Sequence, residues 1–196
     1  MKTFLSVLTQ HQVVLEQLAN NNDEIEAAGA LLINTLKQGG KILLCGNGGS
    51  AADCQHIAAE FVVRYEKKRQ ALAAIALTTD TSILTACAND FDFDAVFSRQ
   101  VEALGNANDC LMAISTSGRS GNVVAAVKAA NNKGMAVIGL TGSEDSELGQ
   151  LATMTIKVPS NITARIQEAH ILIGHWWCAV VEEVLSKEND NAGNNP

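Results

Sequence analysis

The sequence predicts a doubly wound α/β sandwich, in which one five-stranded parallel sheet lies between two layers of helices. Short, almost uninterrupted apolar runs are typical of strands buried on both faces of a parallel sheet. Stretches of helical length separate these runs, and parallel strands need such crossovers. The runs are Lys41–Cys45, Ala74–Thr78, Cys110–Ile114, Met135–Leu140 and Met154–Val158, and the crossovers are 50–66, 81–104, 121–133 and a short one near 144–151.

Two helices are expected before the first strand, within residues 1–38. Apolar side chains recur at helical spacing over residues 4–18 and again over 25–36. The polar segment 20–23 separates the two stretches as a turn. Two glycines at 39–40 then supply a C-terminal cap for the second helix.

A long helix is expected over Thr163–Lys187, followed by a polar, disordered tail at 188–196. Residues 1–196 would thus form a single domain, with the α/β core and last helix at 39–187. The terminal helices exceed what a five-stranded sheet needs for cover, so we expect them to pack between subunits as a helical bundle. The last helix carries an apolar stripe at Ile166, Ala169, Ile173, Trp177, Val180, Val181 and Val184.

The composition excludes several classes of function. The chain has 14 Lys and Arg against 21 Asp and Glu, a net charge of −7, which gives no attraction for nucleic acid. The N-terminal segment lacks the long apolar region of a signal peptide. No stretch approaches the roughly 18 uninterrupted apolar residues of a membrane span. A cytoplasmic protein without a nucleic-acid or membrane partner is expected.

The first predicted strand leads directly into the loop Gly46-Asn47-Gly48-Gly49-Ser50 and then a helix. Unpaired backbone N–H groups at such a helix N-terminus favour an anion, and Asn47 and Ser50 add side-chain donors. The loop is neither a Walker A motif nor a full GxGxxG fingerprint, which disfavours a nucleotide. A tight strand-to-helix turn without a ligand is the alternative.

A second loop of this kind follows the third predicted strand. Hydroxyl groups at a helix N-terminus suit a phosphate monoester, whose oxygens need many short hydrogen bonds. A loop that merely caps the helix is the alternative, but open parallel sheets bind ligands at the carboxyl edge, where both loops lie. The loop has the sequence Ser115-Thr116-Ser117-Gly118-Arg119-Ser120-Gly121-Asn122.

Two helices carry side chains that suit a transition metal. His56 and Glu60 are four residues apart and share one face of the helix after the first loop. Glu60 lies roughly 15 Å along the helix from that loop, which fits a phosphate at one end of an extended sugar and a metal at the other. Gln167 and His175 of the last helix could reach one ion only from opposite sides. A solvated His–Glu pair is the alternative.

Two further features are ambiguous from spacing alone. Asn89 and Asp90 follow a helical run, where they suit either an Asx-type turn or hydroxyl binding to a sugar. His170 points toward the apolar stripe, which favours a buried histidine whose polar groups are satisfied.

These motifs together resemble the phosphoheptose isomerases, over nearly the whole chain to about residue 185. The most specific parts are the GNGGSA loop at 46–51, the HxxxE of His56 and Glu60, and the RIQExHxxxxH pattern that begins at Arg165. The resemblance implies the sugar isomerase (SIS) fold and a homotetramer. It also implies interconversion of sedoheptulose 7-phosphate and D-glycero-D-manno-heptose 7-phosphate, the first step of bacterial heptose biosynthesis for lipopolysaccharide.

The resemblance also implies roles for single residues. His56, Glu60, Gln167 and His175 match the ligands of a Zn²⁺ ion. The positions that match substrate contacts are Asn47, Gly48, Gly49, Ser50, Glu60, Asn89, Asp90, Ser115, Thr116, Ser117, Ser120 and Gln167.

The chain departs from its relatives at two places. Ala164 stands where some members have an aspartate, so no role of that aspartate is transferred. Arg119 replaces a frequent asparagine, and an extra cation beside a phosphate is tolerable.

Ketose–aldose isomerisation needs a base, an acid and stabilisation of a developing oxyanion. Our hypothesis assigns the carbon proton to Glu60, the oxygen proton to His175 and the oxyanion to zinc. The main alternative is a non-catalytic tetrameric scaffold. A relative that binds the replication initiator DnaA has this fold and acts in that way. A sugar-phosphate-sensing domain and an SIS isomerase for another sugar are further alternatives. The retained HxxxE favours an enzyme.

Overall fold

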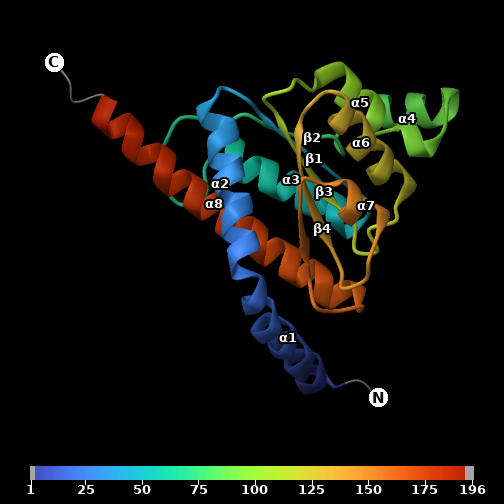
Figure 1. Ribbon diagram of the computed structural model, residues 1–196, viewed down its shortest axis with the longest axis vertical. Coiled ribbons are helices and arrows are strands. Elements are labelled where there is room, and N and C mark those ends of the chain that lie inside the picture. The colour runs from blue at the N-terminus through green and yellow to red at the C-terminus, as the bar shows by residue number, and fades with distance from the viewer. Residues whose placement is uncertain (1–2, 193–196) are drawn as a thin grey trace.

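The computed structural model describes residues 3–192, with side chains through Lys187, and has one parallel sheet in the order β2-β1-β3-β4-β5 (Figure 1). This architecture confirms the predicted doubly wound sandwich. The order changes direction between β1 and β3, and open sheets of this order bind ligands at that point. The strands are β1 (Ile42–Gly46), β2 (Ala74–Ala76), β3 (Cys110–Ile114), β4 (Ala136–Thr141) and β5 (Met154–Lys157).

Helices cover both faces of the sheet (Figure 1). Side chains alternate along each strand, so Leu44 and Met112 enter one apolar cluster and Leu43 and Leu111 the other. The first cluster packs against α1 (Phe4–Leu18), α2 (Asn22–Lys37), α3 (Gly49–Val62) and α8 (Thr163–Ala192). The second packs against α4 (Thr81–Asp90), α5 (Ser98–Leu104), α6 (Gly121–Asn132) and α7 (Glu147–Leu151), with short 3₁₀ turns at Ala19–Asn21 and Phe93–Ala95.

Helix α1 extends away from the sheet (Figure 1). The side chain of Thr3 caps its N-terminus by accepting a hydrogen bond from the backbone N–H of Ser6. Polar contacts attach it to α8: His11 Nδ1 lies 2.7 Å from Glu168 Oε2, and Arg165 donates to the carbonyl of Val7. The predicted turn at 20–23 is a 3₁₀ turn that ends at Asn21, after which α2 begins.

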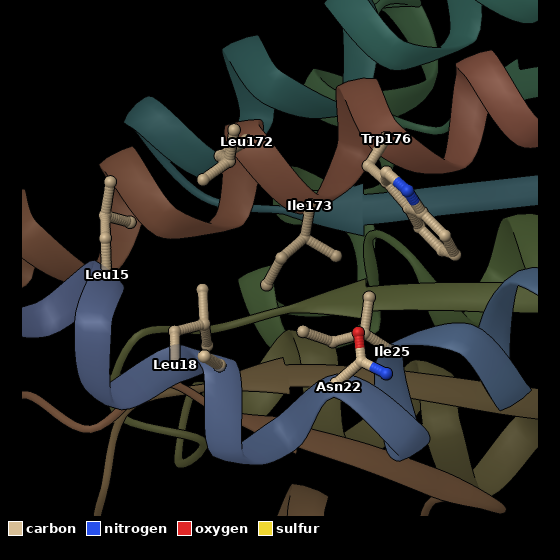
Figure 2. A pocket seen from close by; sticks show the side chains of 8 residues that line it. Leu15, Leu18, Asn22, Ile25, Leu172, Ile173 and Trp176 are labelled. Atoms are coloured by element: carbon tan, nitrogen blue, oxygen red, sulfur yellow. The ribbon is translucent and has the colours of Figure 1, made fainter.

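An apolar groove of about 290 Å³ lies where α1 and α2 meet α8. Figure 2 shows its lining side chains, which come from both sides of the groove. Trp176 is 38% exposed there, while its neighbour Trp177 is buried and donates to the carbonyl of Ile25. The groove is lined mainly by Leu15, Leu18, Ile25, Leu172, Ile173 and Trp176.

Helix α8 continues past the predicted end at Lys187 to Ala192. Residues 188–192, expected as part of a disordered tail, are therefore helical, because neither proline nor glycine interrupts the sequence before Gly193. The rest of that tail, 193–196, lies outside the described residues. None of the helices within residues 3–192 is both long and apolar enough to cross a bilayer.

His170 on α8 is fully buried, and its Nε2 lies 3.2 Å from the carbonyl oxygen of Thr141. Burial lowers the pKa of His170 to about 4, an effect that the hydrogen bond to Thr141 partly opposes. The unfolded chain therefore binds this proton first as the pH falls.

We expect the stability that neutral His170 contributes to be fully present above about pH 6.5 and lost progressively between there and pH 4. The loss amounts to about 3 kcal/mol, since one pKa unit corresponds to about 1.4 kcal/mol. Urea unfolding of the native chain and of His170→Gln between pH 7 and 4.5 measures it. If the free energy of unfolding changed equally with pH in the two proteins, the lowered pKa of His170 would be contradicted.

Candidate functional site

The two predicted loops meet at the carboxyl edge of the sheet, where β1 and β3 are neighbours. They enclose a pocket of about 250 Å³ together with the first turns of α8. Most residues predicted to contact a substrate lie here, and Ile114 and Thr163 join them. The lining consists of Asn47, Gly48, Gly49, Ser50, Ile114, Ser115, Thr116, Ser120, Thr163 and Gln167.

The loop after β1 is shaped by glycine. Gly48 has a φ of 56°, a left-handed conformation that most residues avoid, and α3 begins immediately after it. A Cβ atom on Gly49 would lie 2.6 Å from Nε2 of Gln167, so the amide of Gln167 packs directly on the loop backbone. The β1 loop and α8 thus form two walls of one pocket.

The loop after β3 gathers hydroxyl groups. Ser115 Oγ lies 2.9 Å from Ser120 Oγ and 3.5 Å from Ser117 Oγ. Ser117 Oγ in turn accepts the backbone N–H of Arg119. Ser120 stands at the N-terminus of α6, where the helix dipole favours an anion. This cluster can supply several short hydrogen bonds to phosphate oxygens.

A pair of amides joins the two loops. Asn47 Nδ2 donates to Asn122 Oδ1 and Asn122 Nδ2 donates to Asn47 Oδ1, both at 2.8 Å. Asn122 belongs to the first turn of α6 and is only 1% exposed. Sequence reasoning did not select it as a site residue, because its partner is 75 positions away. The pair fixes the distance between the loops.

Removal of this link is expected to weaken substrate binding. Asn122→Ala leaves the amide of Asn47 without its partner and should raise KM roughly tenfold, with a stability loss of about 1–2 kcal/mol. Steady-state kinetics and urea unfolding check this, with Asn131→Ala, at the far end of α6, as the control. An unchanged KM would show that the pair does not shape the pocket.

The structure brings three of the four predicted metal ligands together. His56 Nε2 on α3 lies 2.9 Å from His175 Nε2 on α8, and 3.6 Å from Glu60 Oε1 one turn further along α3. The two imidazole rings are 4.9 Å apart between centroids and tilted by 58°. The fourth, Gln167, places its amide against Gly49 at the pocket.

The donor set suits zinc. Ligand atoms of a tetrahedral Zn²⁺ lie about 3.3–3.5 Å from one another, because each bond is about 2.0–2.2 Å long. The separations of 2.9 and 3.6 Å lie on either side of that range. Within the described residues, no three His, Cys, Asp or Glu side chains already have the geometry of a cation site.

Asp53 is a neighbour of this cluster that sequence reasoning missed. Its Oδ2 is buried and has no hydrogen-bond partner in the described chain. Burial raises the pKa of Asp53, while the charges of His56 and His175 act to lower it. The signal was present in the sequence, since Asp53 precedes His56 by three residues and shares its helix face.

Other predicted site residues lie outside this pocket. Asn89 and Asp90 are exposed at the end of α4, where Asn89 Nδ2 donates to Asp90 Oδ1. Ser117 lies beside the pocket and lines a smaller hollow of about 150 Å³ together with Thr116. Arg119 is paired with Glu144 at 3.1 Å, so that carboxylate partly offsets its charge.

The sequence is similar to those of known sugar-phosphate isomerases. The pattern of the SIS domain family matches residues 8–142. The chain is 54% identical over 174 residues to the phosphoheptose isomerase of Campylobacter jejuni subsp. jejuni serotype O:6. The aligned region covers 89% of this chain and 94% of that relative. The chain is also 54% identical over 164 residues to the phosphoheptose isomerase of Roseiflexus sp., an alignment that covers 84% of this chain and 83% of that relative.

Solved structures agree with this similarity. The phosphoheptose isomerase from Neisseria gonorrhoeae superimposes with a TM-score of 0.87 at 44% identity, covering 91% of this chain and 96% of that one. The phosphoheptose isomerase from Francisella tularensis gives 0.88 at 37% identity, covering 91% and 95%. Vibrio vulnificus NanR, complexed with ManNAc-6P, gives 0.64 at 20% identity, a likeness of fold alone.

Proposed function

This chain belongs to the SIS domain family and, within it, to the phosphoheptose isomerases, so it is a sugar-phosphate isomerase, and we propose that it converts sedoheptulose 7-phosphate to D-glycero-D-manno-heptose 7-phosphate. One observation carries the proposal. Helices α3 and α8 contribute residues both to a hydroxyl-rich pocket and to the cluster of His56, Glu60 and His175.

The pocket suits the phosphate end of the substrate. The hydroxyl groups of Ser115 and Ser120 and the N-terminus of α6 can bind the phosphate oxygens. The backbone at Gly48 can approach the sugar closely, because no Cβ intervenes and the space beside it is open. Binding at this end holds the far end of the sugar at the second cluster.

The second cluster suits the reacting end. Glu60 removes the proton from C1 of the ketose and returns it to C2 of the enediol, while His175 carries a proton from the C1 hydroxyl to the C2 oxygen. The net reaction moves two hydrogens and leaves the aldose, so no other reactant is needed. A general base of this kind contributes about 10²–10⁴-fold in rate.

His56, Glu60, Gln167 and His175 would hold a zinc ion. When bound, it supplies positive charge that stabilises the developing oxyanion. Histidine nitrogen and carboxylate oxygen are donors that zinc prefers, and zinc does no redox chemistry. An amide ligand is unusual, so the affinity of the site for zinc should be moderate.

A homotetramer is part of the proposal. Helix α1 exposes Phe4 and Leu5 at 78% and 72%, and the apolar groove of Figure 2 lies beside it. An apolar surface of this kind favours burial against further copies of the chain. We also assign the enzyme to the cytoplasm and its product to heptose biosynthesis for lipopolysaccharide.

The test is turnover of a panel of ketose phosphates by the purified protein, with the products identified by NMR. Sedoheptulose 7-phosphate should be converted with a kcat/KM at least tenfold above that for six-carbon and five-carbon analogues. Preference for a shorter sugar would reassign the substrate. Absence of turnover in every case would favour the scaffold that binds DnaA.

A further inference from the structure

A buried charge pair lies behind the reacting cluster and joins α8 to the segment that follows α3. The side chains of Glu182 on α8 and Arg69 are 2% and 3% exposed, and Arg69 Nε lies 3.1 Å from Glu182 Oε1. Because burial of two charges is costly, further hydrogen bonds are needed to stabilise both groups. Those hydrogen bonds lead directly to the site.

The carboxylate of Glu182 holds the chain that follows α3. It accepts the backbone N–H groups of Tyr65 at 3.1 Å, Glu66 at 2.7 Å and Lys67 at 3.0 Å. Burial alone would raise the pKa of Glu182, but these three hydrogen bonds and the charge of Arg69 bring it below its usual value. The carboxylate is therefore ionised at neutral pH and fixes three consecutive peptide groups.

The guanidinium of Arg69 holds the end of α3 itself. It donates to the carbonyl oxygens of Glu60 at 2.6 Å and Phe61 at 2.8 Å. These carbonyls belong to the last turn of α3, where helices leave acceptors without intrahelical partners. The turn that carries Glu60 is thus tied to the same buried pair.

The segment held by Glu182 carries an aromatic ring to the site. The ring of Tyr65 stacks on the imidazole of His175, with centroids 5.8 Å apart and planes inclined by 28°. Tyr65 is half-buried and packs against the apolar cluster on this face of the sheet. His175 precedes Glu182 on α8 by about two helical turns, so one helix carries both the imidazole and the carboxylate that positions its aromatic neighbour.

We propose that Tyr65, held in place by Glu182 and Arg69, is a positioning residue that fixes the orientation of the His175 imidazole. This proposal rests on the function proposed above, in which His175 moves the oxygen proton. Tyr65 acts through its ring and not through its hydroxyl group. Because His175 serves the reacting end, a loss of the ring affects the chemical step more than the binding of the phosphate.

Two substitutions at Tyr65 separate the ring from the hydroxyl group. Tyr65→Leu should lower kcat roughly 10- to 100-fold, because a displacement of about 1 Å at a reacting group costs about 10²-fold. Its KM should change less than about threefold. Tyr65→Phe retains the ring and should keep kcat within about twofold of the native value. Val63→Ala, exposed in the same segment, is the matched control.

A second measurement does not depend on activity. In the metal-free protein, nuclear Overhauser contacts between the imidazole rings of His175 and His56, whose centroids are 4.9 Å apart, should be present in the native protein and in Tyr65→Phe and be lost in Tyr65→Leu. Retention of native kcat or of these ring contacts in Tyr65→Leu would overturn the proposal, as would an equal loss of kcat in Val63→Ala. If the native protein has no turnover, the proposed function fails, while the NMR comparison still decides whether Tyr65 positions His175.

Discussion

Glu60→Gln is expected to lower kcat about 10³-fold and to leave KM within about threefold. The amide retains the shape and hydrogen-bonding reach of the carboxylate, but it cannot take a proton from carbon. The side chain is partly buried, with 25% of its surface accessible, and glutamine has nearly the same volume, so the fold should tolerate the change. Steady-state kinetics with sedoheptulose 7-phosphate measures the effect.

Two controls make this result specific. Glu102→Gln changes an exposed carboxylate on α5, on the opposite face of the sheet, and should leave kcat unchanged. Glu60 is also a proposed zinc ligand, so the zinc content of Glu60→Gln should be matched to that of the native protein. Proton exchange at C1 in deuterium oxide should be lost along with turnover. Near-native kcat in the zinc-matched variant would remove Glu60 from the role of base.

Gly118→Ala is expected to lower kcat/KM by roughly 10²-fold through distortion of the loop after β3. Gly118 has a φ of 64°, and an added Cβ would lie 2.1 Å from the Oγ of Ser146. Ser146 is 5% exposed and caps α7 by accepting the N–H of Gly149, so it cannot move away cheaply. The loop with Ser115 and Ser120 must shift instead.

The matched control for this strain is Gly134→Ala. Gly134 has a similar φ of 72°, but a Cβ there would meet only Ala107, at 3.8 Å, far from the pocket in sequence and fold. Both variants should lose about 1–2 kcal/mol of stability in urea unfolding. Only Gly118→Ala should lose kcat/KM. Equal kinetics for the two variants would show that the loop does not bind the phosphate.

The sheet could be predicted from the sequence because its signals are local. Cys110–Ile114 is a strand with the predicted bounds, and its apolar run between turn residues is sufficient to indicate it. The two loops were also local signals, since glycine and serine residues directly follow strands that parallel pairing brings to one edge. The resemblance to phosphoheptose isomerases was confirmed by the comparisons.

Contacts between distant segments could not be predicted in the same way. The 2.9 Å approach of His56 and His175 depends on how α3 packs against α8, which helical spacing does not determine. The amide pair of Asn47 and Asn122 likewise needs the register of β1 and β3. In the sequence, Glu182 cannot be distinguished from the other charged residues of α8. Only the structure shows that it is buried against Arg69.

The most direct test of the proposed reaction and its metal site measures turnover of sedoheptulose 7-phosphate by the purified protein as isolated, after chelation, and after zinc is restored. Activity should fall at least 10²-fold on chelation and return when zinc is added. Activity that survives complete removal of metal would contradict the metal site of His56, Glu60, Gln167 and His175. No turnover by the folded, zinc-loaded protein would contradict the proposed reaction itself.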